Sequence, residues 1–229
     1  MTEKPTQLDR IEREKIGQEP IVREMISGWL HRPTGAQRKQ GLVITHGAGS
    51  NCNSPLLVAV ADAFAAAGFP VLRCDLPYRQ LKPTGPPIPG GSARDREGLR
   101  RAVLVMREIT EGVILGGHSY GGRQASMLAA EDPEIAEMLL LLSYPLHPPR
   151  KPEQLRTGHF EKLRTAALFI HGTRDPFGRI EEMQAAIALI PARTKLIAIE
   201  KAGHELGESS LGAPLAPAIL REAECFGNG

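Results

Sequence analysis

The chain has 229 residues, of which 41% are hydrophobic and 24% are charged. This length supports one sizeable core and is short for two, so we expect a single globular domain. The formal net charge of +2 comes from 28 basic and 26 acidic residues spread along the chain. No concentrated basic face is expected from that distribution, which excludes nucleic acid as an expected partner.

The first 15 residues lack the apolar core of a signal peptide, and no later run approaches the ~18 uninterrupted apolar residues of a membrane span. We therefore expect a cytoplasmic protein without a membrane partner. Cys52, Cys74 and Cys225 are odd in number and widely spaced, so they indicate neither a disulfide framework nor a zinc site. Small buried or half-buried thiols are the expected role.

Residues 1–20 are polar and predict an N-terminal tail, whereas residues 21–229 are expected to form the domain. One or two edge strands are expected within 20–33. From residue 41 onward, short apolar runs predict strands, and apolar residues at helical spacing predict helices. The expected strands are 41–47, 69–75, 112–117, 137–143, 166–172 and 195–200; the expected helices are 53–68, 93–110, 121–132, 180–190 and 215–226.

This alternation predicts the α/β class, with a mostly parallel sheet of about six to eight strands and helices on both faces. In such sheets, ligand sites lie at the carboxyl ends of the strands. Two proline-rich segments, 78–95 and 144–160, leave that edge and are expected to stay outside the core. They are candidate walls of a substrate pocket, with Tyr78 and His147 as candidate pocket residues, although plain surface connections would have the same composition.

Ser119 lies in the pattern Gly117-His-Ser119-Tyr-Gly121, between an expected strand and an expected helix. The pattern alone is weak, because glycine forms about a tenth of the chain. In a sharp strand-to-helix turn, however, flanking glycines avoid collisions and the serine hydroxyl stands above the sheet edge. The context therefore predicts that Ser119 is a nucleophile.

A serine nucleophile needs a histidine base and an acid that orients it, and in this architecture they follow in the order Ser, acid, His. Asp175 directly follows the expected strand 166–172, and His204 follows the last expected strand. Taken alone, Asp175 before a proline suits a turn or a helix cap, and His204 suits an exposed turn. Their joint placement with Ser119 favours a catalytic triad.

The oxyanion of a tetrahedral intermediate needs two backbone donors. One is expected from Tyr120, the residue after the nucleophile, and the other from Ala48, with Gly49 as the alternate. The same stretch also imitates a dinucleotide-binding G-x-G-x-x-G followed by an acid, Asp75. The imitation is imperfect, since Cys52 occupies the third glycine position.

The phrases "THGAGSN", "DLPYR", "GGHSYGGRQAS", "YPLHPPRKPEQLR", "HGTRDPFG" and "AGHEL" resemble the α/β-hydrolase superfamily over about residues 41–207. The resemblance is nearest to its small dienelactone-hydrolase-like branch. It is narrower still to the group containing testis-expressed protein thirty and the hydrolase-like domain of the non-specific-lethal complex subunit three.

This resemblance implies an α/β-hydrolase fold with a minimal cap, Ser119 as nucleophile, Asp175 as acid and His204 as base. It implies no metal and no organic cofactor. The group usually has methionine at the position of Tyr120, and lysine is common at the position of His118. Arg123 matches the group, and a buried ion pair that braces the helix is its expected role.

We expect a serine hydrolase that cleaves an ester, thioester or related acyl bond of a small-molecule substrate through an acyl-serine intermediate. A peptidase or an acyltransferase would use the same triad. The alternative is a catalytically idle hydrolase-like module that serves in binding or as a scaffold. The natural substrate and the oligomeric state are left open by the sequence.

Overall fold

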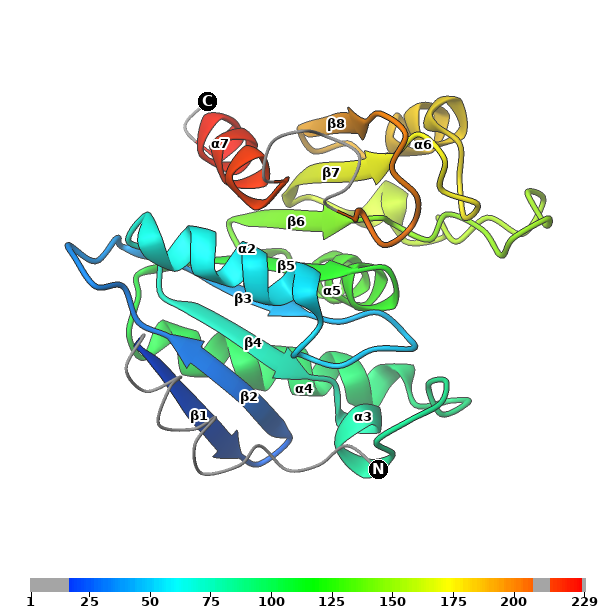
Figure 1. Ribbon diagram of the computed structural model, residues 1–229. Coiled ribbons are helices and arrows are strands. Elements are labelled where there is room, and N and C mark those ends of the chain that lie inside the picture. Colours follow the sequence, from blue (N-terminus) through cyan, green and yellow to red (C-terminus); the bar gives the residue numbers. More distant parts are fainter. Residues whose placement is uncertain (1–16, 208–214, 228–229) are drawn as a thin grey trace.

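The structure, a computed structural model, describes residues 17–207 and 215–227. Within them, eight strands form one sheet in the order β1-β2-β4-β3-β5-β6-β7-β8 (Figure 1). From β4 to β8 all neighbouring strands in that order are parallel, and only β1 with β2 and β2 with β4 pair antiparallel. The strands are β1 (Gln18–Arg23), β2 (Ile26–His31), β3 (Gln40–Thr45), β4 (Val71–Asp75), β5 (Gly112–His118), β6 (Met138–Leu142), β7 (Ala166–Gly172) and β8 (Thr194–Ile199).

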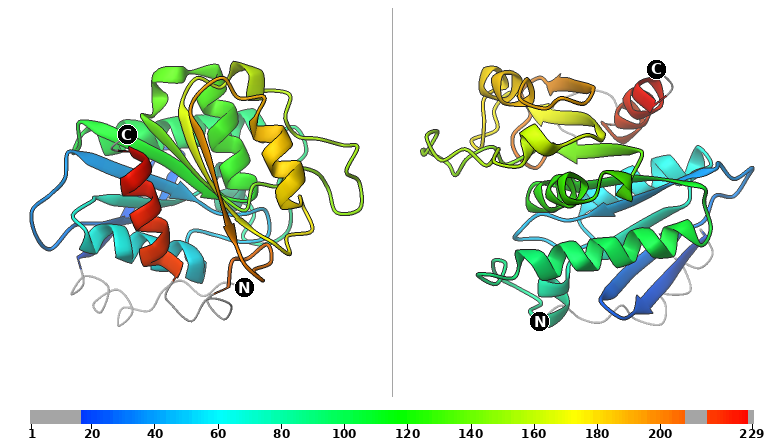
Figure 2. Two further views of the ribbon diagram at one scale, coloured as in Figure 1. Left: turned by 90° about the horizontal axis from the view of Figure 1, so that it is seen from above. Right: turned by 180° about the vertical axis from the view of Figure 1, so that it is seen from behind.

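Helices cover both faces of the sheet (Figure 2). Helices α2 (Pro55–Ala66) and α7 (Leu215–Gly227) pack on one face with one apolar cluster. The longer helices of the other face, α4 (Ser92–Arg107), α5 (Tyr120–Glu131) and α6 (Ile180–Ile187), contribute to a second cluster. The shorter helices are α3 (Pro77–Leu81), η1 (Pro133–Ile135) and η2 (Phe160–Lys162). The sheet thus separates two cores, as the continuous apolar strands predict.

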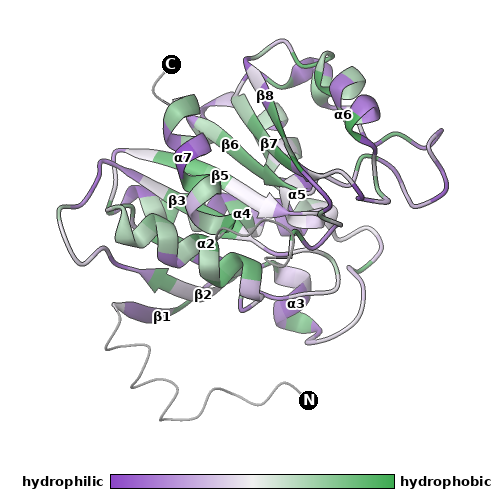
Figure 3. Ribbon diagram, turned by 45° about the horizontal axis from the view of Figure 1, so that its top comes forward, coloured by the Kyte–Doolittle hydropathy of each residue, from purple (hydrophilic) through white to green (hydrophobic). Residues whose placement is uncertain are grey.

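The central strands show why this sequence forms a buried parallel sheet. All residues of β5 and β6 are buried, and β6 has the sequence MLLLL. Figure 3 shows β6 and β7 as hydrophobic ribbons in the middle of the molecule. Because side chains alternate between the faces of a strand, an uninterrupted apolar run supplies both cores at once.

Local sequence signals explain the ends of α2. The Ser54 hydroxyl accepts a hydrogen bond from the Leu57 amide at 3.4 Å, and Pro55 occupies the first turn. The chain leaves the helix through Gly68, whose φ of +95° is unfavourable for residues with a side chain. A Cβ atom at Gly68 would also lie 2.7 Å from the Ala36 carbonyl oxygen.

The predicted fold class is confirmed: this is an α/β-hydrolase fold with eight strands and helices on both faces. Two expectations need correction. Strand β1 begins at Gln18, three residues inside the segment assigned to the tail; residues 1–16 lie outside the described residues. The proline-rich segments also reach the core, because Tyr78, Tyr144 and Phe160 are at most 2% exposed.

No helix in residues 17–207 and 215–227 is both long enough and apolar enough to cross a membrane.

Candidate active site

Ser119 occupies the turn between β5 and α5 with φ 51° and ψ −117°, a conformation that side-chain-bearing residues rarely adopt. Its amide donates to the Leu142 carbonyl oxygen at 2.8 Å, which ties the turn to β6. Glycines permit the close crossing of strand and helix. A Cβ atom at Gly117 would lie 2.5 Å from the backbone of Gly121, and one at Gly121 would lie 2.6 Å from the His46 carbonyl oxygen.

Ser119, His204 and Asp175 lie in one hydrogen-bonded series. The Ser119 Oγ is 2.8 Å from His204 Nε2, and His204 Nδ1 is 2.7 Å from Asp175 Oδ2. Asp175 follows β7 and has a fully buried side chain, whereas His204 lies after β8 with a side chain 15% exposed. Three segments that are far apart in the sequence therefore meet at the carboxyl edge of the sheet, where the sequence predicted the site.

The imidazole of His204 is held by more than the carboxylate. The Phe177 ring lies against it with centroids 4.2 Å apart. The second oxygen of Asp175 accepts the Phe177 amide at 2.8 Å, so the residue that stacks on the imidazole is bound to the same carboxylate. His118 donates from Nε2 to the His204 carbonyl oxygen at 2.8 Å, and burial lowers its pKa. His118 thus holds the backbone of the residue that carries the candidate base.

The predicted oxyanion donors come from two places. Tyr120 opens α5, and the first amides of a helix have no acceptor within the helix. Ala48 and Gly49 lie in the loop after β3. Gly47 brings this loop against Ser119, since a Cβ atom at Gly47 would lie 3.4 Å from the Ser119 Cβ.

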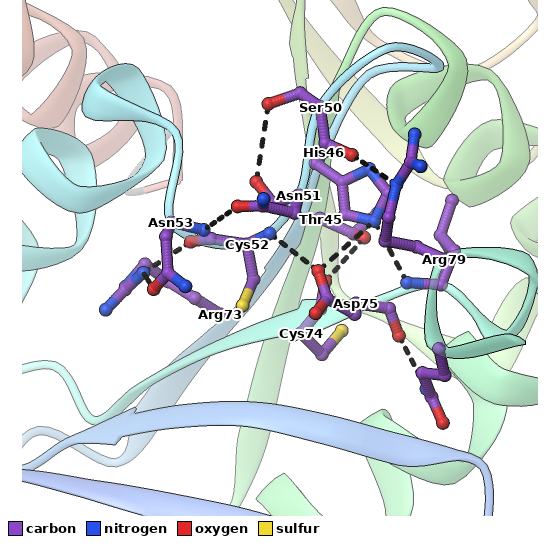
Figure 4. A network of polar contacts seen from close by, with 12 residues as sticks. Thr45, His46, Ser50, Asn51, Cys52, Asn53, Arg73, Cys74, Asp75 and Arg79 are labelled. Carbon is purple, nitrogen blue, oxygen red and sulfur yellow. Dashed lines mark hydrogen bonds and ion pairs between the residues drawn. The ribbon is translucent and has the colours of Figure 1, made fainter. Parts of the chain in front are cut away.

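A polar network beneath this loop links β3 to β4 (Figure 4). His46 donates from Nδ1 to the Gly47 carbonyl oxygen at 2.8 Å and accepts the Leu76 amide at Nε2, 3.1 Å away. Acceptance of the Leu76 amide at Nε2 requires a neutral ring, and burial lowers the pKa of His46. Asp75 accepts the Cys52 amide at 2.7 Å. The acid of the rival dinucleotide pattern is therefore used to hold the loop.

The two candidate pocket residues are both almost completely buried. Tyr78 is 2% exposed, and its hydroxyl donates to the carbonyl oxygen of Ala48 at 2.9 Å. His147 is 5% exposed, donates from Nδ1 to the Pro148 carbonyl oxygen and lies 3.3 Å from Glu182. Their role as substrate-pocket residues stays a prediction.

The expected ion pair of Arg123 is absent from the described part of the chain. Its Nε is buried without a hydrogen-bond partner there, and no described carboxylate lies within salt-bridge distance. Arg123 does act on its neighbours electrostatically. Burial is the main cause that lowers the pKa of Arg156, and the charge of Arg123 adds to it.

A cavity of about 710 Å³ lies between α2 and α7, beside the segment that carries His204. His118, Glu205 and Leu206 contribute to its wall together with apolar residues of both helices. None of its lining residues belongs to 78–95 or 144–160, the segments expected to wall a pocket. In the described residues, no group of three or more His, Cys, Asp or Glu side chains is arranged to hold a metal ion.

Sequence reasoning missed three residues around the site: Arg79, Asp95 and Phe177. Arg79 and Phe177 stand inside the phrases "DLPYR" and "HGTRDPFG", each just after a strand, which is a signal that could have drawn attention to them. Asp95 lies in the first turn of α4 and is 1% exposed. A buried carboxylate requires hydrogen-bond partners, but no sequence pattern names them.

Residues 38–213 match the alpha/beta hydrolase domain family. Among solved structures, Est1E from Butyrivibrio proteoclasticus is similar with a TM-score of 0.72 and 16% identity, over 93% of this chain and 100% of that one. A dienelactone hydrolase from Anabaena variabilis is similar with a TM-score of 0.68 and 22% identity, over 92% of this chain and 97% of that one. The esterase domain of a Rhodothermus marinus protein is similar with a TM-score of 0.64 and 18% identity, over 87% of this chain and 92% of that one.

These structural similarities support the fold, and the dienelactone-hydrolase-like resemblance extends over nearly the whole chain. The narrower group named from the sequence stays a prediction. Since the family match covers more than half of the residues, the chain belongs to the alpha/beta hydrolase domain family.

Proposed function

We propose that this protein is a serine hydrolase that cleaves an ester, thioester or related acyl bond through an acyl-Ser119 intermediate. The observation that carries the proposal is the continuous series from the Ser119 hydroxyl through His204 to Asp175, with contacts of 2.8 and 2.7 Å. A serine hydroxyl is nearly inert at neutral pH, and in such a series the histidine activates it by taking its proton.

In the first half of the reaction, His204 Nε2 takes the hydroxyl proton while Ser119 Oγ attacks the acyl carbon. The carbonyl oxygen becomes an oxyanion, which the amides of Tyr120 and Ala48, or of Gly49 as the alternate, would bind. His204 then gives its proton to the leaving group, and the bond to that group breaks. Ser119 is left as an ester of the acyl group.

In the second half, His204 takes a proton from water, and the resulting hydroxide attacks the acyl carbon. Collapse of the second tetrahedral intermediate returns the proton to Ser119 Oγ and releases the acid. Throughout, Asp175 accepts a hydrogen bond from His204 Nδ1 and holds the ring with Nε2 toward the serine. The triad needs no metal or organic cofactor for these steps.

An ester is the favoured substrate because the names of two similar structures, an esterase domain and a dienelactone hydrolase, point to that chemistry. A small-molecule acyl substrate remains the predicted partner. The expected cytoplasmic location also stays a prediction; Cys52, Cys74 and Cys225 are free thiols, which suits a reducing compartment.

The test combines fluorophosphonate labelling with hydrolysis of p-nitrophenyl esters from acetate to octanoate. We expect labelling at Ser119 and a loss of ~10⁴-fold or more in kcat for Ser119→Ala. Ser126→Ala is the matched control, because Ser126 also hydrogen bonds to a histidine, at 2.8 Å from His159, yet is fully buried. A folded wild type that neither reacts with the probe nor hydrolyses esters would instead favour the idle scaffold.

A further inference from the structure

Hydrogen bonds to its carbonyl oxygens hold the loop after β3 in place. The Gly47 carbonyl oxygen accepts from His46 Nδ1 at 2.8 Å, from the Ser50 amide at 3.1 Å and from the Tyr78 hydroxyl at 3.3 Å. The Ala48 carbonyl oxygen accepts from the same hydroxyl at 2.9 Å and from Arg79 Nη2 at 2.9 Å. Two successive peptide groups are thus fixed by donors on α3.

Arg79 also hydrogen bonds to a second loop, the segment after α3 that contains Lys82 and Gly85. Its guanidinium is buried and donates from Nε to Ser50 at 2.7 Å, from Nη1 to Lys82 at 3.0 Å and from Nη2 to Gly85 at 2.9 Å, always to carbonyl oxygens. Figure 4 shows Arg79 beside Ser50 and the ring of His46. Arginine suits this position because its rigid fork carries five donors and no acceptor.

Fixed carbonyls also orient the amides. In a planar trans peptide, the N–H points opposite to the carbonyl of the preceding residue. With the Gly47 and Ala48 carbonyls held toward Tyr78 and Arg79, the amides of Ala48 and Gly49 point away from them. The Ala48 amide, with that of Gly49 as the alternate, is the oxyanion donor expected from this loop, and the loop lies against Ser119.

Asp95 links this arrangement to the other oxyanion donor. Its Oδ1 accepts the Tyr78 amide at 3.1 Å, and its Oδ2 accepts the Tyr120 hydroxyl at 2.8 Å. The rings of Tyr78 and Tyr120 also meet edge to face, with centroids 5.8 Å apart. Tyr78, which donates to the Ala48 carbonyl oxygen, is therefore linked through the Asp95 carboxylate to Tyr120, the residue after Ser119.

We propose that Tyr78 and Arg79 are positioning residues that aim the amides of the oxyanion hole, by holding the carbonyl oxygens of Gly47 and Ala48. The inference rests on the proposed serine hydrolase function. Neither side chain touches the substrate; each acts through the backbone of the loop. Loss of this grip weakens transition-state binding and leaves substrate binding in the ground state unchanged.

The experiment compares Tyr78→Phe and Arg79→Lys with two control variants. Tyr144→Phe removes another buried hydroxyl that donates to a backbone carbonyl, that of Arg156, and Arg193→Lys shortens another arginine that donates to a carbonyl, that of Phe226. For each variant we would measure kcat and KM with a p-nitrophenyl ester, and thermal unfolding. Two inhibition constants complete the set, one for a trifluoromethyl ketone and one for the product acid.

We expect kcat to fall ~10-fold in Tyr78→Phe and ~10²-fold in Arg79→Lys at unchanged KM, because misplacement of ~1 Å at a reacting centre has effects of this size. The trifluoromethyl ketone forms an oxyanion on Ser119, so its inhibition constant should rise by the same factors. The inhibition constant of the product acid should not change. A merely structural role would move the melting temperature without this split.

Two results would overturn the inference. If the wild type is active and both variants match their controls in kcat and in ketone inhibition, the positioning role is wrong while the hydrolase function stands. If the wild type neither turns over esters nor reacts with a fluorophosphonate, the function fails and the inference falls with it. If Arg79→Lys does not fold, Tyr78→Phe alone decides, since it removes only one hydroxyl.

Discussion

Asp175 uses both carboxylate oxygens to fix the geometry of the candidate base. Oδ2 accepts from His204 Nδ1 at 2.7 Å, and Oδ1 accepts from the amide of Phe177, whose ring stacks on the imidazole. The hydrogen bond to Nδ1 places the proton on that nitrogen, so Nε2 is left as an acceptor toward the Ser119 hydroxyl. The buried Asp175 side chain thus determines the tautomer of the His204 ring, orients that ring, and holds the Phe177 backbone whose ring packs against it.

Asp175→Asn should therefore lower kcat by about 10⁴-fold while the protein stays folded. An asparagine can still accept the Phe177 amide, but its NH₂ group would face His204 and favour the tautomer with the proton on Nε2. The measurement is ester hydrolysis, with circular dichroism and thermal unfolding as controls for folding. A variant that keeps more than a tenth of the wild-type kcat would contradict the role given to this carboxylate.

At the residue scale, the sequence predicted Ser119, Asp175 and His204 as a candidate triad because each follows a strand. It did not predict Arg79 or the contacts of Tyr78. Their partners are the carbonyl oxygens of Gly47, Ala48 and Ser50, and every residue has a carbonyl. Such contacts leave no pattern of residue types, so only the folded backbone shows them.

The strand-to-helix turn is the element that determines how closely Ser119 approaches the loop after β3. Gly121 lies at the start of α5, where a Cβ atom would meet the His46 carbonyl oxygen at 2.6 Å and the Thr45 Cγ2 at 2.7 Å. Backbone atoms cannot move aside as a flexible side chain can. The helix would have to shift away from β3, and the nucleophile with it.

We expect Gly121→Ala to reduce the free energy of unfolding by roughly 2 kcal/mol, as overpacking against backbone does. Gly49→Ala is the matched control. Nothing lies within 4 Å of a Cβ atom at Gly49, so its stability should change by less than ~0.5 kcal/mol. Urea unfolding of both variants provides the measurement, and equal stabilities would show that α5 can move away from β3 without a penalty.

At the element scale, sequence patterns predicted the strands better than the connections. A run such as residues 138–142 is apolar throughout and allows little else than a buried strand. Helix α3 was missed because five residues are too short to show a helical period. The segment 144–160 was expected outside the core because of its prolines, yet it places Tyr144 and Phe160 there, each fully buried. Prolines limit backbone shape but do not prevent neighbouring rings from packing.

Across the whole molecule, parallel strands bring the site together. The loops after β3, β5, β7 and β8 contribute His46, Ser119, Asp175 and His204, and these strands are parallel neighbours or linked through β6. Because the carboxyl ends of parallel strands share one edge, Ser119 and His204, which are 85 positions apart in the sequence, meet there. Several of the buried groups near this edge are histidines, so the stability of the fold should depend on pH.

Burial favours the neutral form of four histidines in the folded protein. Burial is the main cause that lowers the pKa of His46, His118 and His171, and it lowers the pKa of His159 to about 4. In the unfolded chain, each titrates near its ordinary value of about 6.5. Between about pH 6.5 and pH 4, the unfolded state therefore binds more protons than the folded state.

The free energy of unfolding should accordingly be highest above about pH 6.5 and should decrease as the pH falls toward 4. Urea titrations at pH 7, 6 and 5 would measure the slope. His159→Gln serves as the internal comparison: glutamine cannot take up a proton but can still hydrogen bond to Ser126, which contacts His159 at 2.8 Å. This variant should lose less stability than the wild type over the same range. A stability that stays constant from pH 7 to pH 5 would mean that these rings take up protons as readily in the fold as in the unfolded chain. That result is incompatible with His46 accepting the Leu76 amide at Nε2.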